Sequence, residues 1–161
     1  MDIQTWPREA QLAYVAAMID AEGNIGIGLR RSRCGRSPCH EGYVVFTNTS
    51  KAALDALDSL FPSIRQNPQR TIGKPIFRLR WTNNRMLALI RAILPYLIIK
   101  REQAQLVLEL AETRTPNKGR PKYWRVDSEL LQRRDVLRER ILTLNGRFSE
   151  SSALASSPSE Y

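Results

Sequence analysis

Two carboxylates stand beside a glycine where an apolar segment ends. In YVAAMIDAEGNIGI, residues 14–27, Asp20 and Glu22 come directly before Gly23. The apolar spacing of residues 8–21 predicts a helix, and a glycine is a common place for a helix to end. A helix C-terminus carries a partial negative charge, so each acid there costs about 0.3–1 kcal/mol. A bound cation would offset that cost; the alternative is a helix that ends in solvent with two acids.

The chemistry that suits such a helix end is magnesium binding. Carboxylates and free backbone carbonyls are hard oxygen ligands, which magnesium prefers. We therefore expect a metal site built from Glu22 and the backbone carbonyl of Ala21. Magnesium usually takes one or two carboxylates and leaves positions for water and substrate phosphates. The second carboxylate would be the Glu22 of a second copy of the chain.

A stripe of alanines on the same helix offers a surface for that second copy. Ala13, Ala17 and Ala21 recur at every fourth residue, so they share one helix face. They would let two helices approach closely, although burial in the chain's own core is the alternative. If two helices pair about a two-fold axis, two Glu22 carboxylates lie side by side. That arrangement predicts hydrolysis of two phosphodiester bonds at the centre of a long, nearly palindromic DNA site.

The charge of the chain indicates a polyanionic partner. Among 161 residues, 25 are Lys or Arg and 16 are Asp or Glu, which gives a net charge of +9. Nucleic acid is the first candidate and an anionic membrane surface the second. The last expected helix mixes charges of both signs, which argues against a membrane surface. With no run of 18 apolar residues and no signal-peptide pattern, we expect an intracellular protein without a membrane partner.

The cysteines and the histidine cluster in a short, basic stretch. Cys34, Cys39 and His40 are fewer than the four ligands that a structural zinc site requires. A disulfide is disfavoured in a reducing compartment. We therefore expect a basic polar loop with two free thiols.

The periodicity of the chain predicts an α+β fold. Helices are expected at residues 8–21, 50–61, 83–94, 100–112 and 127–145. Strands are expected at residues 24–31, 43–48, 63–72 and 74–81, paired as two hairpins. Residues 1–146 are assigned to one domain, and the Ser-rich residues 147–161 have the composition of a disordered tail.

Each expected strand is apolar on one face and polar or basic on the other. Helices would cover the apolar face and leave the second face open. A β-ribbon fits the major groove of DNA, so this open antiparallel face is a candidate DNA-binding surface. Two such sheets in a two-fold pair would form one long saddle.

Residues 15–23, VAAMIDAEG, resemble the LAGLIDADG motif of homing endonucleases in chemical type at every position. Residues 95–110, PYLIIKREQAQLVLEL, resemble the family segment that carries an active-site lysine. Residues 46–61, FTNTSKAALDALDSLF, resemble its second strand and the helix that follows. One motif in a short chain is similar to the homodimeric, single-motif branch. The resemblance covers residues 8–113 and implies an αββαββα fold with a saddle-shaped DNA-binding sheet and extra C-terminal helices.

The resemblance also implies roles for matching residues in the active site. Glu22 of each subunit would bind divalent metal, assisted by the carbonyl of Ala21. Magnesium would support cleavage, whereas calcium would support binding without cleavage. Lys100 would stabilise charge on the phosphate or poise the attacking water. Asn48 would orient that water, with Lys51 assisting.

Three further positions have roles outside the metal and water sites. Asp20 would be mainly structural at the helix end. Ala13 and Ala17 would lie in the dimer interface.

By the same resemblance, the open sheet face and the loops would contact DNA. Sheet residues expected to read bases or hold phosphates are Asn24, Gly28, Arg30, Tyr43, Val45, Thr47, Arg65, Asn67, Arg70, Ile76, Arg78 and Arg80. Loop and linker residues expected to add phosphate contacts are Arg31, Arg33, Arg36, Lys118, Arg120 and Lys122. Each phosphate contact steepens the salt dependence of binding.

Three departures from the family pattern involve four positions. The metal ligand is Glu22 where the motif has aspartate, and the water-orienting residue is Asn48 where related sequences often have glutamine. Gly26 and Gly28 replace larger side chains on the first strand, so we expect sparse base reading there.

The sequence thus predicts a homodimeric, magnesium-dependent endonuclease that cuts both strands of a long pseudo-palindromic DNA site, in an organelle or a prokaryotic cytoplasm. The alternative is an intron maturase that binds intron RNA, or a catalytically inactive DNA- or RNA-binding protein of the same fold. An inactive binder has no need of Glu22 and Lys100. The presence of both residues favours the enzyme.

Overall fold

The computed structural model describes residues 3–30, 38–69, 75–114 and 126–146, with backbone positions alone for 65–69. The elements, in chain order, are η1 (Ile3–Thr5), α1 (Arg8–Glu22), β1 (Gly23–Arg30), β2 (Cys39–Asn48), α2 (Lys51–Leu60), β3 (Ile64–Gln69), β4 (Ile76–Thr82), α3 (Asn83–Ile93), η2 (Leu94–Tyr96), α4 (Arg101–Glu112) and α5 (Ser128–Leu144). This order confirms the expected αββαββα arrangement with extra helices after it.

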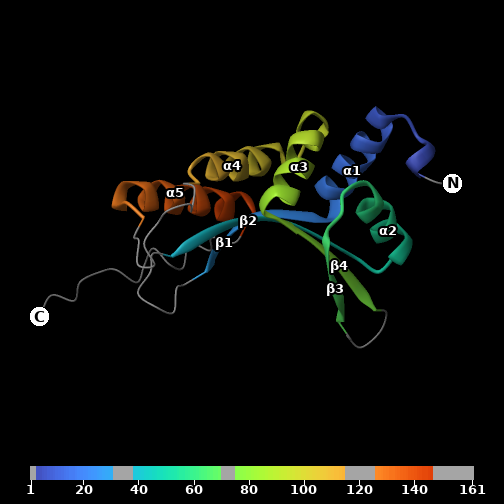
Figure 1. Ribbon diagram of the computed structural model, residues 1–161, viewed down its shortest axis with the longest axis horizontal. Helices are drawn as coiled ribbons and strands as arrows, with labels where there is room; N and C mark the ends of the chain where they lie inside the picture. The colour runs from blue at the N-terminus through green and yellow to red at the C-terminus, as the bar shows by residue number, and fades with distance from the viewer. Residues whose placement is uncertain (1–2, 31–37, 70–74, 115–125, 147–161) are drawn as a thin grey trace, which may run out of the picture.

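The described strands form one antiparallel sheet in the order β1-β2-β4-β3. The two expected hairpins are therefore joined through β2 and β4. Val44 in β2 lies opposite Ile25 on one side and Trp81 on the other. Figure 1 shows the α-helices gathered on one face of this sheet. In the described part of the chain no helix covers the other face, which we call the open face.

Alternation along the strands separates the core from the open face. Ile25, Val44, Phe46, Leu79 and Trp81 are almost fully buried beneath the helices. Apolar side chains from α1 to α5 complete this core. Buried indole nitrogens need an acceptor, and the Trp81 Nε1–H donates to the carbonyl of Phe61 at 2.8 Å. This pairing holds the end of α2 against the sheet.

Local signals account for the ends of the helices. Ser50 precedes α2, and its Oγ accepts a hydrogen bond from the N–H of Ala53 at 3.4 Å, as expected for an N-cap. At the end of α1 the Gly23 N–H donates to the Ile19 carbonyl. A Cβ atom on Gly23 would lie 2.7 Å from that carbonyl oxygen, so only glycine allows the chain to pass this closely from helix to strand.

Strand β2 begins earlier than the sequence predicts. It starts at Cys39, so the loop assignment of Cys39 and His40 is wrong. The His40 side chain is fully buried, and its Nε2 lies 2.8 Å from Asp135 Oδ1 of α5. Packing under α5 thus extends the strand through residues that show no apolar alternation. Cys39 is an exposed free thiol, and Cys34 lies outside the described residues.

Helix α5 is fastened to α4 by arginine contacts. Buried Arg134 donates from Nε to Thr113 Oγ1 at 3.0 Å and from Nη2 to the Thr113 carbonyl. On the exposed side, Arg133 pairs with Glu109 at 2.8 Å. The helix after the αββαββα unit is therefore packed as part of the same body. Within the described ranges, no helix combines the length and apolar character needed to cross a bilayer.

Two strand glycines give a matched test of this packing. A Cβ atom on Gly42 would lie 2.8 Å from Val107 Cγ1 and 3.1 Å from Met86 Sδ. Because Val107 is rigid at χ1 in its helix, we expect Gly42→Ala to lower the free energy of unfolding by about 1–3 kcal/mol. The measurement is urea denaturation followed by circular dichroism.

Gly28→Ala is the control for that substitution. Its Cβ would lie 3.7 Å from the nearest atoms, which is ordinary contact. We expect its stability to stay within about 0.5 kcal/mol of the parent or to rise. Equal losses in both variants would contradict the packing of β2 against α3 and α4.

Candidate active site and nucleic-acid interface

The first acid of the motif, Asp20, is buried at the end of α1. Its carboxylate accepts hydrogen bonds from the backbone N–H groups of Ile98 at 2.8 Å, Ile99 at 3.2 Å and Lys100 at 2.9 Å. These groups immediately precede α4. A buried carboxylate needs such donors. Asp20 therefore joins two segments 80 residues apart in the sequence.

The Lys100 side chain closes the same end of α1. Its Nζ donates to the carbonyl of Ile19 at 3.0 Å and to the carbonyl of Asp20. An ammonium at a helix C-terminus is favourable. The Lys100 ammonium is therefore the cation that offsets the cost of Asp20 at this helix end. Burial lowers the pKa of Lys100, and the charge of Asp20 partly opposes this. An ammonium has three N–H donors, so a third remains for another acceptor.

The second acid, Glu22, is exposed at the last position of α1. Its Oε2 accepts a hydrogen bond from Asn48 Nδ2 at the end of β2. The Asn48 Oδ1 in turn accepts from the N–H of Ser50 at 2.7 Å. Lys51, the first residue of α2, pairs with Asp55 at 2.9 Å. The structure thus brings together the predicted residues Glu22 and Asn48.

The oxygen donors at this junction fit a shared divalent metal. Glu22 offers an exposed carboxylate, and Ala21 is among the last helical residues, whose carbonyls lack partners within a helix. The carbonyls of Ile19 and Asp20 are occupied by Lys100. In the described ranges no three His, Cys, Asp or Glu side chains cluster closely enough to hold a metal. A metal here would need further ligands, such as a second carboxylate, water or phosphate.

The outer face of α1 is available for another chain. Ala13, Ala17 and Ala21 are exposed, so burial of these alanines in the chain's own core is wrong. Ile98 and Ile99, whose backbones bind Asp20, are 86% and 70% exposed. An apolar surface thus continues from α1 to the segment before α4.

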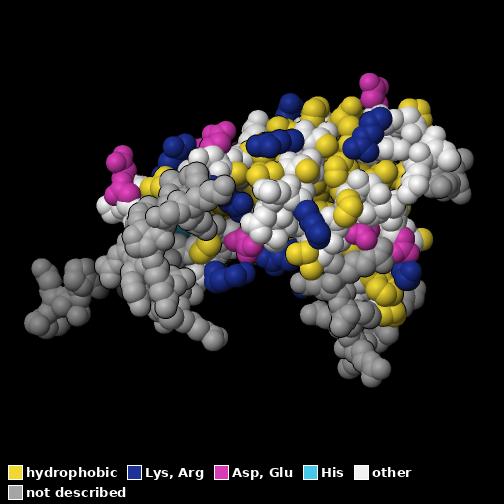
Figure 2. All heavy atoms as spheres, in the orientation of Figure 1, with side chains coloured by type: hydrophobic (Ala, Val, Ile, Leu, Met, Phe, Trp, Pro, Cys, Tyr) yellow, Lys and Arg dark blue, Asp and Glu magenta, His cyan; other side chains and the backbone are white. Residues whose placement is uncertain are grey.

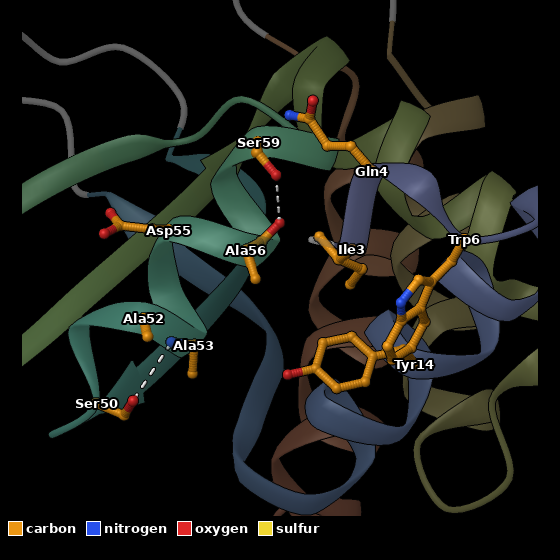
Figure 3. Close-up of a pocket in the computed structure, with 10 residues that line it drawn as sticks. All are labelled: Ile3, Gln4, Trp6, Tyr14, Ser50, Ala52, Ala53, Asp55, Ala56 and Ser59. Carbon is orange, nitrogen blue, oxygen red and sulfur yellow. Dashed lines mark hydrogen bonds between the residues drawn. The ribbon is translucent and has the colours of Figure 1, made fainter. Parts of the chain in front are cut away.

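A groove lies between η1 and α1 on one side and α2 on the other (Figure 3). The rings of Trp6 and Tyr14 meet edge to face, with centroids 5.8 Å apart, and small side chains of α2 face them. The lining of this groove does not include Glu22, Asn48 or Lys100. It is separate from the junction that carries the candidate active site.

The open face carries most of the predicted sheet contacts. Its positions on the three strands with described side chains are Asn24, Gly26, Gly28, Arg30, Cys39, Glu41, Tyr43, Val45, Thr47, Ile76, Arg78, Arg80 and Thr82. Basic side chains are not confined to this face, because Figure 2 also shows Lys and Arg on the helix side.

A tyrosine fills the space that a glycine leaves on β1. A Cβ atom on Gly26 would lie 2.5 Å from Tyr43 Oη, so the phenol lies across this strand. The Arg80 guanidinium sits 5.0 Å from the centre of the same ring, in cation–π geometry. The Tyr43 side chain therefore covers the surface at Gly26, which the small residue alone would leave empty.

An acidic residue, Glu41, was not expected on this face. Its carboxylate lies 3.3 Å from Arg30 and 3.8 Å from Arg80. The sequence places Glu41 in the loop before the expected strand at residues 43–48, so it is not among the predicted sheet contacts. The signal that could have found it is its strand spacing, two residues before Tyr43.

The pairing of β3 changes which of its residues share the open face. Arg65 lies opposite Leu79, which belongs to the core face, whereas Gln66 lies opposite Arg78. After an irregularity, Gln69 lies opposite Ile76. The register thus favours the two glutamines over Arg65 as open-face positions. Asn67 falls within the irregular stretch.

The remaining predicted DNA contacts lie outside the described residues. They are Arg31, Arg33, Arg36, Arg70, Lys118, Arg120 and Lys122.

Solved structures with the same architecture are homing endonucleases bound to DNA. The homing endonuclease I-CvuI, in complex with the I-CreI target, has a TM-score of 0.70 and 19% identity, covering 85% of this chain and 83% of that chain. The LAGLIDADG homing endonuclease I-SmaMI, bound to cleaved DNA, has a TM-score of 0.61 and 15% identity, covering 94% of this chain and 51% of that chain.

A third structure agrees with these two. The LAGLIDADG meganuclease I-AabMI, bound to uncleaved DNA, has a TM-score of 0.62 and 18% identity, covering 90% of this chain and 48% of that chain. No family model matches the sequence, and no curated protein matches it significantly. The motif at residues 15–23, the αββαββα order and these three structures agree: the chain has the fold of the LAGLIDADG homing endonucleases.

Proposed function

We propose that the chain is a site-specific DNA endonuclease that acts as a homodimer and cuts both strands with a divalent metal, magnesium. The observation that carries this proposal is the meeting of Glu22, Asn48 and Lys100 at the end of α1 and the start of α4. An exposed carboxylate, an amide and a half-buried ammonium are the groups that phosphodiester hydrolysis uses to bind metal, hold water and neutralise charge.

The homodimer is supported by what one chain offers. Glu22 is a single carboxylate at the proposed metal site, so a two-fold partner would supply the second. The exposed alanines Ala13 and Ala17 lie on the same helix, and Ile98 and Ile99 are further exposed apolar side chains. The chain also matches about half of the length of I-SmaMI and most of I-CvuI.

Metal binding is assigned to Glu22 of both copies with the carbonyl of Ala21. When bound, the metal would neutralise phosphate charge and lower the pKa of a coordinated water.

The chain's own donors would position the scissile phosphate and the water. Lys100 donates two N–H groups to the end of α1, and the third would bind a phosphate oxygen. Of the two roles considered for Lys100, charge stabilisation fits this geometry better, because Nζ donates to two carbonyls and keeps its third N–H for a phosphate oxygen. Asn48 uses one amide N–H for Glu22 and retains a second for water.

DNA recognition is assigned to the open face. Its arginines and polar residues lie on adjacent antiparallel strands, a shape that enters the major groove. I-CvuI and I-SmaMI, which share the fold, are bound to DNA in their structures.

A selection on randomised duplex DNA tests the proposal. The purified chain is incubated with the library in magnesium or in calcium, and cut or bound duplexes are sequenced. We expect a long, nearly palindromic sequence to be cut in magnesium and only bound in calcium. Enrichment without cutting in either metal would move the assignment to an inactive binder, and RNA binding would then be measured to test the maturase alternative.

Glu22→Gln separates cleavage from binding. The amide keeps the size of the side chain but removes the charge that attracts a metal, so we expect cleavage to disappear while affinity for the selected duplex stays within a few-fold. Cleavage and gel-shift assays on that duplex measure both. Glu112→Gln, an exposed charge change on α4, is the control. Equal loss of cutting and binding would show that Glu22 is structural.

Lys100 predicts the alkaline limit of the reaction. Because burial lowers its pKa from 10.5, the ammonium loses its proton at a lower pH than an exposed lysine does. Cleavage should therefore fall as pH rises through this lowered pKa. Lys100→Met should reduce the rate by about 100-fold or more. Lys100→Arg remains charged, so its slower cleavage should lack the alkaline decline in a pH–rate profile; an unchanged decline would assign it to another group.

Arg78 tests the open face. Arg78 is on β4, opposite Thr47 of β2. An arginine contact with guanine contributes about 1–3 kcal/mol of discrimination between bases. We expect Arg78→Ala to weaken binding and relax one base position per half-site, measured by competition among single-base variants of the selected duplex. Arg91→Ala, on the exposed side of α3, is the matched control. Uniform weakening across all variants would mean that Arg78 contacts only phosphate.

A further inference from the structure

Glu41 is an acidic side chain within a basic surface. Its carboxylate lies 3.3 Å from Arg30 Nη2 and 3.8 Å from Arg80 Nη2, so one acid contacts arginines from two strands. Among the described open-face residues it is the acid present. Tyr43 supports the second arginine through its ring. These four side chains form a connected cluster, which we call the Glu41 cluster.

The cluster is open enough to contact a ligand. The side chains of Arg30, Arg80 and Glu41 are 78%, 33% and 22% exposed. Gly28 lies directly opposite Glu41 on β1 and has no side chain to cover the carboxylate. The Glu41 cluster therefore presents one acceptor group between two donor groups.

Stability does not explain this arrangement. The Arg30 partner is 78% exposed and the Arg80 partner is 3.8 Å away, and ion pairs with a solvated or distant partner contribute little to folding. A carboxylate on a surface that faces DNA is repelled by phosphates. Glu41 would therefore weaken binding to DNA unless its oxygens meet donors on the DNA itself.

Base edges supply such donors in the major groove. Guanine presents the acceptors N7 and O6, which arginine binds, and the cytosine paired with it presents the N4 amino group, which glutamate accepts. A guanidinium and a carboxylate in contact thus match the two halves of one G·C pair. The Glu41 cluster has this combination already formed in the chain.

We propose that Glu41 is a specificity-determining residue, which holds Arg30 and Arg80 and selects a G·C pair at one position of each half-site. The inference rests on the proposed function, because it assigns a base preference to the same DNA-binding face. It adds a preference for one base pair, and it assigns that preference to an acidic residue.

A binding selection with charge-matched variants tests the proposal. The full chain, Glu41→Gln and Glu109→Gln are each incubated with a randomised duplex library in calcium, and the bound duplexes are sequenced. Glu109 is the control because it also pairs with an arginine, Arg133, but on the helix side. Both variants raise the net charge by one, so the control accounts for the change in overall charge.

We expect Glu41→Gln to reduce the preference for G·C at one position per half-site by about tenfold, while Glu109→Gln retains the parent preference. Arg30→Gln, at a side chain exposed enough to leave folding intact, should relax the same position. A melting temperature for each variant confirms that it is folded.

Three outcomes would overturn the proposal. Glu41→Gln and the parent chain could enrich the same base at every position, or Glu41→Gln and Arg30→Gln could relax different positions. If the parent chain itself enriches no sequence, the proposed function fails together with this inference. The behaviour of the parent chain distinguishes that failure from failure of the Glu41 assignment alone.

Discussion

The junction of α1 and α4 depends on one exchange of hydrogen bonds. Asp20 accepts from three backbone N–H groups ahead of α4, and Lys100 returns its ammonium to two carbonyls at the end of α1. Each side chain supplies hydrogen-bond partners to backbone groups that would otherwise be unpaired at a helix end. The unfavourable position of an acid at a helix C-terminus is thereby explained for Asp20 without any ligand.

The same exchange leaves Glu22 free for another role. Because Asp20 and Lys100 complete the end of the helix, Glu22 extends past it to Asn48. The close passage at Gly23 then turns the chain into β1 directly beneath the site. The rigid core of the sheet and helices thus supports the candidate active site, while the open face begins within one residue of it. This short connection links the candidate active site to the proposed DNA-binding face.

Local patterns in the sequence predict the helices and most strands, because amphipathic spacing and caps such as Ser50 act over a few residues. They do not predict contacts that depend on strand register. The ion pairs of Glu41 follow from pairing across β1, β2 and β4, and the register of β3 sets Arg65 opposite Leu79. The early start of β2 depends on burial under α5, which lies about a hundred residues later. The partners of Asp20 are distant in the same way.

Two of the departures from the family pattern, Glu22 and Asn48, contact one another. Glu22 is one methylene longer than the aspartate of the motif, and Asn48 is one methylene shorter than the glutamine that related sequences often carry. In the structure these side chains are hydrogen bonded to each other, so a longer carboxylate meets a shorter amide. The Ser50 N–H fixes the other end of the Asn48 amide and leaves its orientation defined. Restoring only one of the two family residues would change the span of this pair, whereas exchanging both would preserve it.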